Sequence, residues 1–113
     1  MTGVQTCALP ISAFVGGLGF VPGANFGDEC AIFEAVHGSA PDIAGKDIAN
    51  PTAVLRSALL MLDHLGEHEA SGRITAALEN VYRTKEKLTR DVGGSSGTSK
   101  FADSVIEAMG SAD

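Results

Sequence analysis

Basic residues, cysteines and long apolar runs are all scarce in this 113-residue chain. Lys and Arg together number 8 against 14 Asp and Glu, which gives a formal net charge of -6. Nucleic-acid binding needs clustered basic side chains on phosphates, so this composition argues against that partner and favours a small-molecule ligand. The longest apolar run, 58–62, is far shorter than the roughly 20 residues that cross a bilayer, so no membrane span is expected.

The two cysteines, Cys7 and Cys30, lie outside any Cys-x-x-Cys or Cys/His cluster. This spacing argues against a metal or redox role. A reducing, cytoplasmic location fits best. We expect Cys30 to be a small, buried or half-buried loop residue.

Residues 1–11 differ in character from the rest of the chain. They lack the basic region and the apolar length of a secretory leader. They resemble the translation of a common sequencing-library adapter read from a GTG start codon. We therefore interpret residues 1–12 as a non-native leader and residues 13–113 as the natural segment, which is long enough for one modest domain.

Short strands are expected in the first part of that segment. After the tail of a broken helix, residues 18–21 predict a strand, Pro22-Gly23 a turn, and residues 25–28 a loop. Residues 31–36 are mostly strand-favouring and bounded by polar turns, which predicts a buried strand.

Three helices are expected in the remainder. The first begins at Asn50-Pro51, where Asn can cap free amides, and runs to about Leu65, with Gly66 following it. The second begins near Glu67, and Thr98 caps the third. Their predicted inward positions are Val54, Leu55, Ala58, Leu59, Met61, Leu62 and Leu65; Ala70, Ile74, Ala77, Leu78 and Val81; and Phe101, Ala102, Val105, Ile106 and Met109.

This order of strands, loop and helices indicates part of a layered α/β domain, because such helices need a sheet to cover. The loop 38–50 lies between a strand end and a helix start, where α/β proteins bind nucleotides. Asp42 is the candidate acid, since it can bond both ribose hydroxyls and repel a 2′-phosphate. On geometry alone, a loop with two glycines is also simply a turn.

A family resemblance adds weight to the nucleotide interpretation. The string Phe-Glu-Ala-Val-His-Gly-Ser-Ala-Pro-Asp-Ile-Ala-Gly-Lys at 33–46, followed by Ile-Ala-Asn-Pro-Thr-Ala at 48–53, resembles the cofactor loop of NAD-dependent isocitrate and 3-isopropylmalate dehydrogenases almost letter for letter. Asp-Val-Gly-Gly at 91–94 continues the resemblance, which covers essentially 13–109. The resemblance implies that this chain is the C-terminal part of the large domain of an isopropylmalate dehydrogenase-like α/β fold. It also implies that the parent protein is a homodimer or larger oligomer.

The resemblance also implies roles for individual loop residues. His37 would lie against the adenine and ribose, Asp42 would hold the ribose hydroxyls, and Asn50 would contact the adenine edge. Backbone contacts would come from Gly38, Ser39, Ala40 and Pro41. NADP-dependent relatives carry Lys and Tyr where Asp42 and Ile43 stand here, so the resemblance favours NAD.

The implied reaction is hydride transfer from a small 2-hydroxy acid to NAD, followed by a decarboxylation that Mg or Mn assists. The family's Tyr and Lys, its substrate-binding arginines and its metal-binding aspartates belong to segments upstream of Ala13. We therefore expect no catalytic residue and no metal ligand in this chain, and Tyr82 is not the family's tyrosine. Glu34 lies near the nicotinamide side or pairs with a structural Arg. His64 and His68 are expected to be solvated.

Isocitrate is the favoured substrate, because residues 34–37 and 88–91 look more like the NAD-dependent isocitrate enzymes. The alternatives are a 3-isopropylmalate dehydrogenase, a noncatalytic regulatory-type subunit, and a truncated, inactive reading frame. An Asn-x-x-Gly-Asp-x-x-x-Asp type segment encoded upstream would mark a catalytic parent. The isolated chain is expected to be inactive and poorly soluble or partly molten, because its helices expose faces meant for absent strands.

Overall fold

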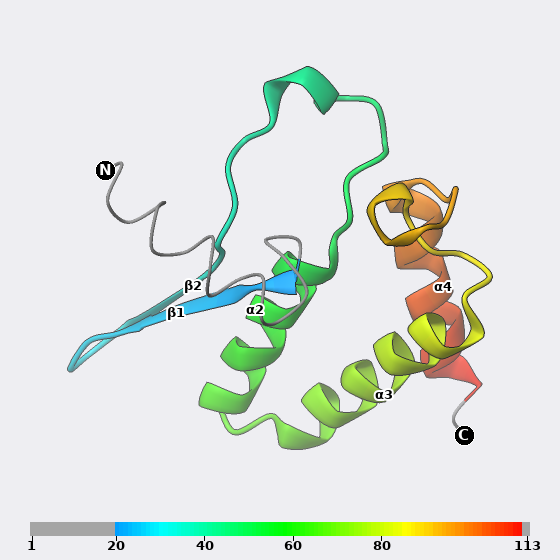
Figure 1. Ribbon diagram of the computed structural model, residues 1–113. Helices are drawn as coiled ribbons and strands as arrows, with labels where there is room; N and C mark the ends of the chain where they lie inside the picture. Colours follow the sequence, from blue (N-terminus) through cyan, green and yellow to red (C-terminus); the bar gives the residue numbers. More distant parts are fainter. Residues whose placement is uncertain (1–19, 112–113) are drawn as a thin grey trace.

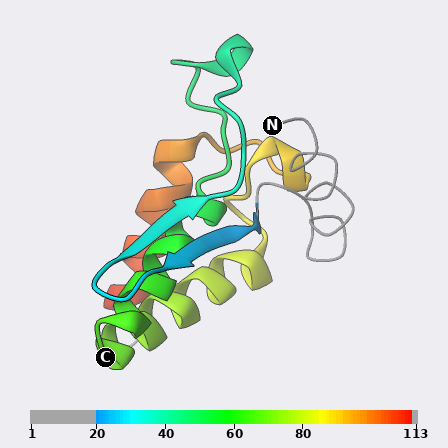
Figure 2. The same ribbon diagram turned by 90° about the vertical axis from the view of Figure 1, so that its left-hand side faces the viewer.

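The computed structural model describes residues 20–111, which form a two-stranded antiparallel sheet and three α-helices (Figure 1). In chain order the main elements are β1 (Pro22–Phe26), β2 (Ala31–Ala35), α2 (Thr52–His64), α3 (His68–Thr84) and α4 (Thr98–Gly110). The hairpin packs on α2, α2 contacts α3, and α3 packs on α4. Figure 2 shows the loop between β2 and α2 standing beyond the hairpin and the helices. The predicted α/β class is confirmed.

The hairpin places Pro22 opposite Ala35 and Phe26 opposite Ala31. The predicted turn at Pro22-Gly23 is therefore wrong, because both residues belong to β1. The loop predicted over 25–28 is correct only for residues 27 and 28, because Asn25 and Phe26 also belong to β1. Proline is tolerated here because it is the first residue of an edge strand, where no ladder hydrogen bond is lost. Part of the predicted strand 18–21 and the broken helix before it lie outside the described residues; Phe20 and Val21 precede β1.

The second strand is half buried rather than fully buried as predicted. Its exposure alternates, and Ile32 and Glu34 point away from the protein while Phe33 is partly covered. One face of this antiparallel sheet packs on α2 and the other meets solvent, which produces the alternation. The expectation for Cys30 is also wrong: it is exposed at the hairpin tip, where its carbonyl accepts a hydrogen bond from the Gly27 N–H at 2.7 Å.

The first long helix begins at Thr52 and ends as predicted, with Gly66 in the left-handed conformation (φ 82°). Its buried residues are Thr52, Ala53, Ser57 and Leu59. Val54, Met61 and Leu65, which were predicted to point inward, are 54%, 39% and 64% exposed. The apolar residues of α2 occupy more than one side of the helix, and the described segments cover the side that carries the small residues.

The main core lies between α3 and α4. It consists of Ala77, Leu78, Val81, Leu88, Phe101 and Val105. The predicted inward stripe is confirmed for Phe101 and Val105 but wrong for Ile106, which is 65% exposed because it lies one helical position further round. Thr98 is the first residue of α4, and Gly97 occupies the cap position, so the predicted Thr98 cap is also wrong.

Candidate functional site

The loop between β2 and α2 forms an arch that leaves the hairpin and returns to the start of α2 (Figure 1). Its crest is a single 3-10 turn, Pro41–Ile43, in which the Ile43 N–H donates to the Ala40 carbonyl at 3.1 Å. Ala40, Gly45 and Asp47 adopt left-handed backbone conformations, with φ of 41°, 76° and 54°. Non-glycine residues pay a steric cost there, and such strain clusters at functional sites.

An open cavity of about 850 Å³ lies against this loop. The loop contributes His37, Gly38, Ser39, Ala40, Ile43, Ala44, Gly45, Asp47, Ile48, Ala49 and Asn50 to its wall. Asp91 and Thr98 complete the wall from the segment between α3 and α4 and from the start of α4. A cavity of this size is within the range of small-molecule sites.

The structure brings most of the predicted site residues together around this cavity. His37, Gly38, Ser39, Ala40, Ile43 and Asn50 all line it. Pro41 and Asp42 do not: they are exposed in the 3-10 turn at the crest, between the lining residues Ala40 and Ile43. Sequence reasoning missed Asp91 and Thr98, because no local pattern links them to a loop that lies far from them in the chain.

Asn50 ties the returning leg of the loop to the helices. Its Nδ2 donates to Asp91 Oδ2 at 2.9 Å and to Tyr82 Oη at 3.2 Å, and its Oδ1 accepts from the Thr52 N–H at 3.0 Å. The Tyr82 and Thr52 hydroxyls lie 2.5 Å apart. As predicted, the Asn50 side chain accepts a free amide at the start of α2, but Pro51 and not Asn50 holds the cap position, so the predicted start is one residue too early. Each polar atom of this side chain already has a partner.

Asp47 ties the same leg to α4. Its Oδ1 accepts hydrogen bonds from the Ser99 N–H at 2.9 Å and the Ser99 hydroxyl at 2.8 Å. Its backbone carbonyl accepts from the Thr98 N–H at 3.0 Å. The hydroxyl and then the amide of Ser99 hold the pKa of the Asp47 carboxyl below its ordinary value of 3.8, because both bonds favour the charged form.

Two further predicted residues lie close to the loop. His37 is exposed, and its Nδ1 lies 3.0 Å from the neighbouring Gly38 carbonyl oxygen. Glu34 is exposed on the outer face of β2, and within residues 20–111 it forms no ion pair. Its two alternatives, a place near the nicotinamide and a pair with a structural Arg, stay predictions.

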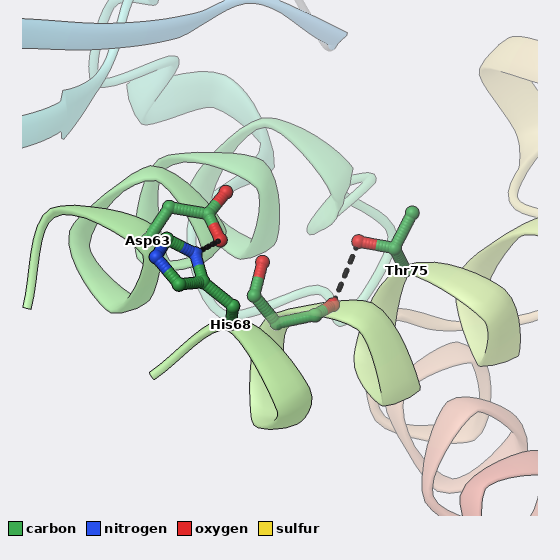
Figure 3. A network of polar contacts seen from close by, with 4 residues as sticks. Asp63, His68 and Thr75 are labelled. Carbon is green, nitrogen blue, oxygen red and sulfur yellow. Dashed lines mark hydrogen bonds and ion pairs between the residues drawn. The ribbon is translucent and has the colours of Figure 1, made fainter. Parts of the chain in front are cut away.

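The remaining histidines lie at the turn between α2 and α3, away from the cavity. Both are exposed, as predicted, and His68 Nδ1 lies 3.2 Å from Asp63 Oδ1 (Figure 3). Further along α3, the Thr75 hydroxyl donates to the Ser71 carbonyl at 2.8 Å (Figure 3). Residues 20–111 contain no group of three His, Cys, Asp or Glu side chains placed to hold a metal ion. No helix in this part of the chain has the length and apolarity that crossing a membrane requires.

Comparison with known proteins gives consistent matches. The family model described as isocitrate/isopropylmalate dehydrogenase matches residues 10–105. Isocitrate/homoisocitrate dehydrogenase of Thermus thermophilus is 52% identical over 98 residues, which are 87% of this chain and 29% of that protein. The 3-isopropylmalate/3-methylmalate dehydrogenase of Methanocaldococcus jannaschii is 56% identical over 95 residues, 84% of this chain and 28% of that protein.

A mitochondrial relative and a solved structure extend these matches. Subunit 2 of the mitochondrial NAD isocitrate dehydrogenase of Kluyveromyces lactis is 50% identical over 95 residues, 83% of this chain and 26% of that subunit. The crystal structure of isocitrate dehydrogenase from Methylococcus capsulatus superposes with a TM-score of 0.81 at 45% identity, and covers 87% of this chain and 30% of that one. The chain thus spans less than a third of the length of these relatives. It belongs to the isocitrate/isopropylmalate dehydrogenase family.

Proposed function

We propose that this chain is the C-terminal segment of an NAD-dependent oxidative decarboxylase that converts isocitrate to 2-oxoglutarate, and that the loop 37–50 binds the adenosine half of NAD. The observation that carries the proposal is the cavity of about 850 Å³ against this loop. Most of the residues that the family resemblance assigns to adenosine lie in its wall. The name of the Kluyveromyces lactis relative, an NAD isocitrate dehydrogenase, supports the choice of cofactor.

The chemistry of the cavity wall suits an adenosine. Ala40, Ile43 and Ala49 offer apolar surface to a base, and the His37 ring is free to lie against the adenine and ribose. The polar atoms of the Asn50 side chain are already hydrogen-bonded, whereas its backbone N–H and carbonyl have no partner within residues 20–111. Contact with the adenine edge would therefore use the Asn50 backbone.

Asp42 is the group that would distinguish NAD from NADP. Of the other acids near the cavity, Asp47 is bonded to Ser99 through Oδ1 and has its Oδ2 against Gly97. Both carboxylate oxygens of Asp91 accept bonds, from the Thr89 hydroxyl at 2.6 Å and from Asn50. Asp42 has no hydrogen-bond partner among the described residues and sits at the crest between two lining residues. A free carboxylate there would accept bonds from ribose hydroxyls and repel a 2′-phosphate.

The remainder of the reaction depends on segments outside this chain. When bound, NAD accepts a hydride from the 2-hydroxy acid. Mg or Mn, whose ligands would belong to the rest of the parent protein, would assist the decarboxylation. We propose a homodimer or larger oligomer for that parent. The second candidate substrate is 3-isopropylmalate, because the Methanocaldococcus jannaschii relative named for it is 56% identical to this chain.

A titration followed by NMR tests the cofactor assignment. The 113-residue chain is titrated with NAD, NADP and AMP, and we expect NAD and AMP to shift the amide signals of residues 37–50, with NADP binding more weakly. Asp42→Lys should reduce this preference for NAD, because it replaces the repelling charge with an attracting one. Asp103→Lys makes the same charge change on an exposed position of α4 and should leave the preference unchanged.

Two results would contradict the proposal. One is a set of NAD-induced shifts that lies outside the loop and its wall. The other is a preference for NAD that survives Asp42→Lys unaltered. Substrate choice is tested separately, by turnover of isocitrate against 3-isopropylmalate in the full-length parent.

A further inference from the structure

The two legs of the loop differ in how they are held. Within residues 20–111, the outgoing leg and crest, 37–46, form hydrogen bonds only among themselves. The returning leg bonds to the start of α4 through Asp47 and through Ala49, whose carbonyl accepts from the Thr98 hydroxyl at 2.5 Å. The shape of the cavity therefore depends on this one attachment and on Asn50.

The attachment replaces a helix cap. The cap residue of α4 is Gly97, which has no side chain to accept bonds from the first amides of the helix. The Asp47 carboxylate takes that place from a segment about fifty residues away and accepts the Ser99 N–H. A negative charge is also favourable at a helix N-terminus.

The backbone is shaped to allow this approach. Asp47 itself has φ of 54°, which turns its carboxylate and its carbonyl toward α4. A Cβ atom added at Gly97 would overlap the Asp47 carboxylate and lie 2.7 Å from its carbonyl oxygen. The contact therefore depends on both partners: on glycine at position 97 of the helix and on the left-handed backbone of Asp47 in the loop.

We propose that Asp47 is a positioning residue, which holds the cofactor loop against α4 in the conformation that binds adenosine. This inference rests on the proposed function. Asp47 lines the cavity, but its Oδ1 is bonded to Ser99 and its Oδ2 lies against Gly97, so the carboxylate faces α4. It would therefore act through the shape of the loop. If only a fraction of molecules has the loop attached, the apparent dissociation constant for NAD rises by the inverse of that fraction.

The experiment combines amide hydrogen exchange with calorimetric titration of NAD on the 113-residue chain. Asp47→Ala should accelerate exchange of the Ser99 amide and weaken NAD binding roughly fivefold, which corresponds to attachment in about a fifth of molecules. Gly97→Ala, which keeps the carboxylate but displaces it, should act in the same direction. Asp103→Ala removes an equal charge from α4 and should change neither quantity.

A second, hybrid protein keeps the proposal testable if a variant of the 113-residue chain fails to fold. The same substitutions are made in a hybrid in which residues 13–113 replace the matching segment of the Thermus thermophilus relative. There, Asp47→Ala should raise the KM for NAD with little change in kcat, because the substitution alters the fraction of competent loops rather than the reacting groups.

The outcomes separate the two proposals. If the unsubstituted chain and the hybrid bind no NAD, the proposed function fails, and the Ser99 exchange rate still decides whether Asp47 holds the loop. Faster exchange with unchanged NAD affinity, in a chain that binds NAD, overturns the positioning role. Behaviour of Asp47→Ala indistinguishable from that of Asp103→Ala overturns the attachment itself.

Discussion

Removing one hydroxyl group tests the network that anchors Asn50. In Tyr82→Phe the ring remains and should keep its contacts with Phe20 and Phe101, whose centroids both lie 5.7 Å from its own. The lost atom is the partner of the Thr52 hydroxyl at 2.5 Å. Thr52 is only 1% exposed, so water cannot readily take the place of that partner.

The expected loss in the free energy of unfolding follows from the burial of Thr52. A buried hydroxyl left without a partner costs about 1 to 3 kcal/mol, and the Asn50 amide loses only its longer bond because it keeps Asp91 at 2.9 Å. We therefore expect Tyr82→Phe to lower the free energy of unfolding by about 1 to 3 kcal/mol. Thr52→Val removes the other hydroxyl with nearly the same shape and should cost less, because the half-buried Tyr82 hydroxyl keeps Asn50 Nδ2 at 3.2 Å as a partner.

Urea denaturation of the two single variants and the double variant forms a mutant cycle. Once both hydroxyls are absent, no buried group lacks a partner. The free energy of unfolding of the double variant should therefore fall by markedly less than the sum of the two single decreases. Additive losses would show that the two hydroxyls do not interact, and a loss below about 0.5 kcal/mol for Tyr82→Phe would show that Thr52 finds another partner. Either result would refute the reasoning.

Two other predictions concern the connection between α3 and α4 and the attachment of Asp47 to α4. Gly94→Ala should strongly destabilise the connection between α3 and α4, because the added Cβ would overlap the Leu88 carbonyl. Gly72→Ala, in α3 with open space around the new atom, should instead stabilise by about 1 kcal/mol, and thermal melts distinguish the two variants. The Asp47 attachment should persist at neutral pH and be lost in acid. Its pKa is depressed in the folded chain, so its contribution is complete above the unfolded value of 3.8 and disappears as the pH falls through the lower folded pKa. The pH dependence of the Ser99 amide shift measures this loss, which Asp47→Asn should abolish.

The loop was predictable from the sequence because its residues are contiguous. Gly45 provides a left-handed position, Pro41 begins the 3-10 turn, and Asn50 accepts the first amide of the following helix, all within one short segment. The other wall of the cavity was not predictable in this way. Asn50 and Asp91 are 41 positions apart, and Asp47 and Ser99 are 52 apart, so their pairing depends on how α3 and α4 pack.

Helical periodicity located the helices but not the side of α2 that is buried. The number of apolar residues on α2 exceeds what one face can hold, so the period alone does not choose between faces. The choice is made by Ala53 and Ser57, whose small side chains let neighbouring elements approach closely. The turn predicted at Pro22-Gly23 was wrong for a related reason. The two residues favour a turn locally, but their pairing with β2 extends the backbone there.

The exposed side of α2 is consistent with the greater length of the relatives. Val54 and Leu65 leave more than half of their surface in solvent, and Ile32 on the outer face of β2 is exposed to a similar degree. A two-stranded sheet is marginal by itself, and apolar surface of this kind normally contacts further elements of the same domain. Since the matched segment is less than a third of each relative, the rest of such a domain would supply those elements. The cavity differs in this respect, because the contacts that shape the loop, from Asn50 to Asp91 and from Asp47 to Ser99, are all made within this segment. The proposed adenosine site can therefore be tested on this segment, whereas a test of substrate choice requires the proposed full-length parent.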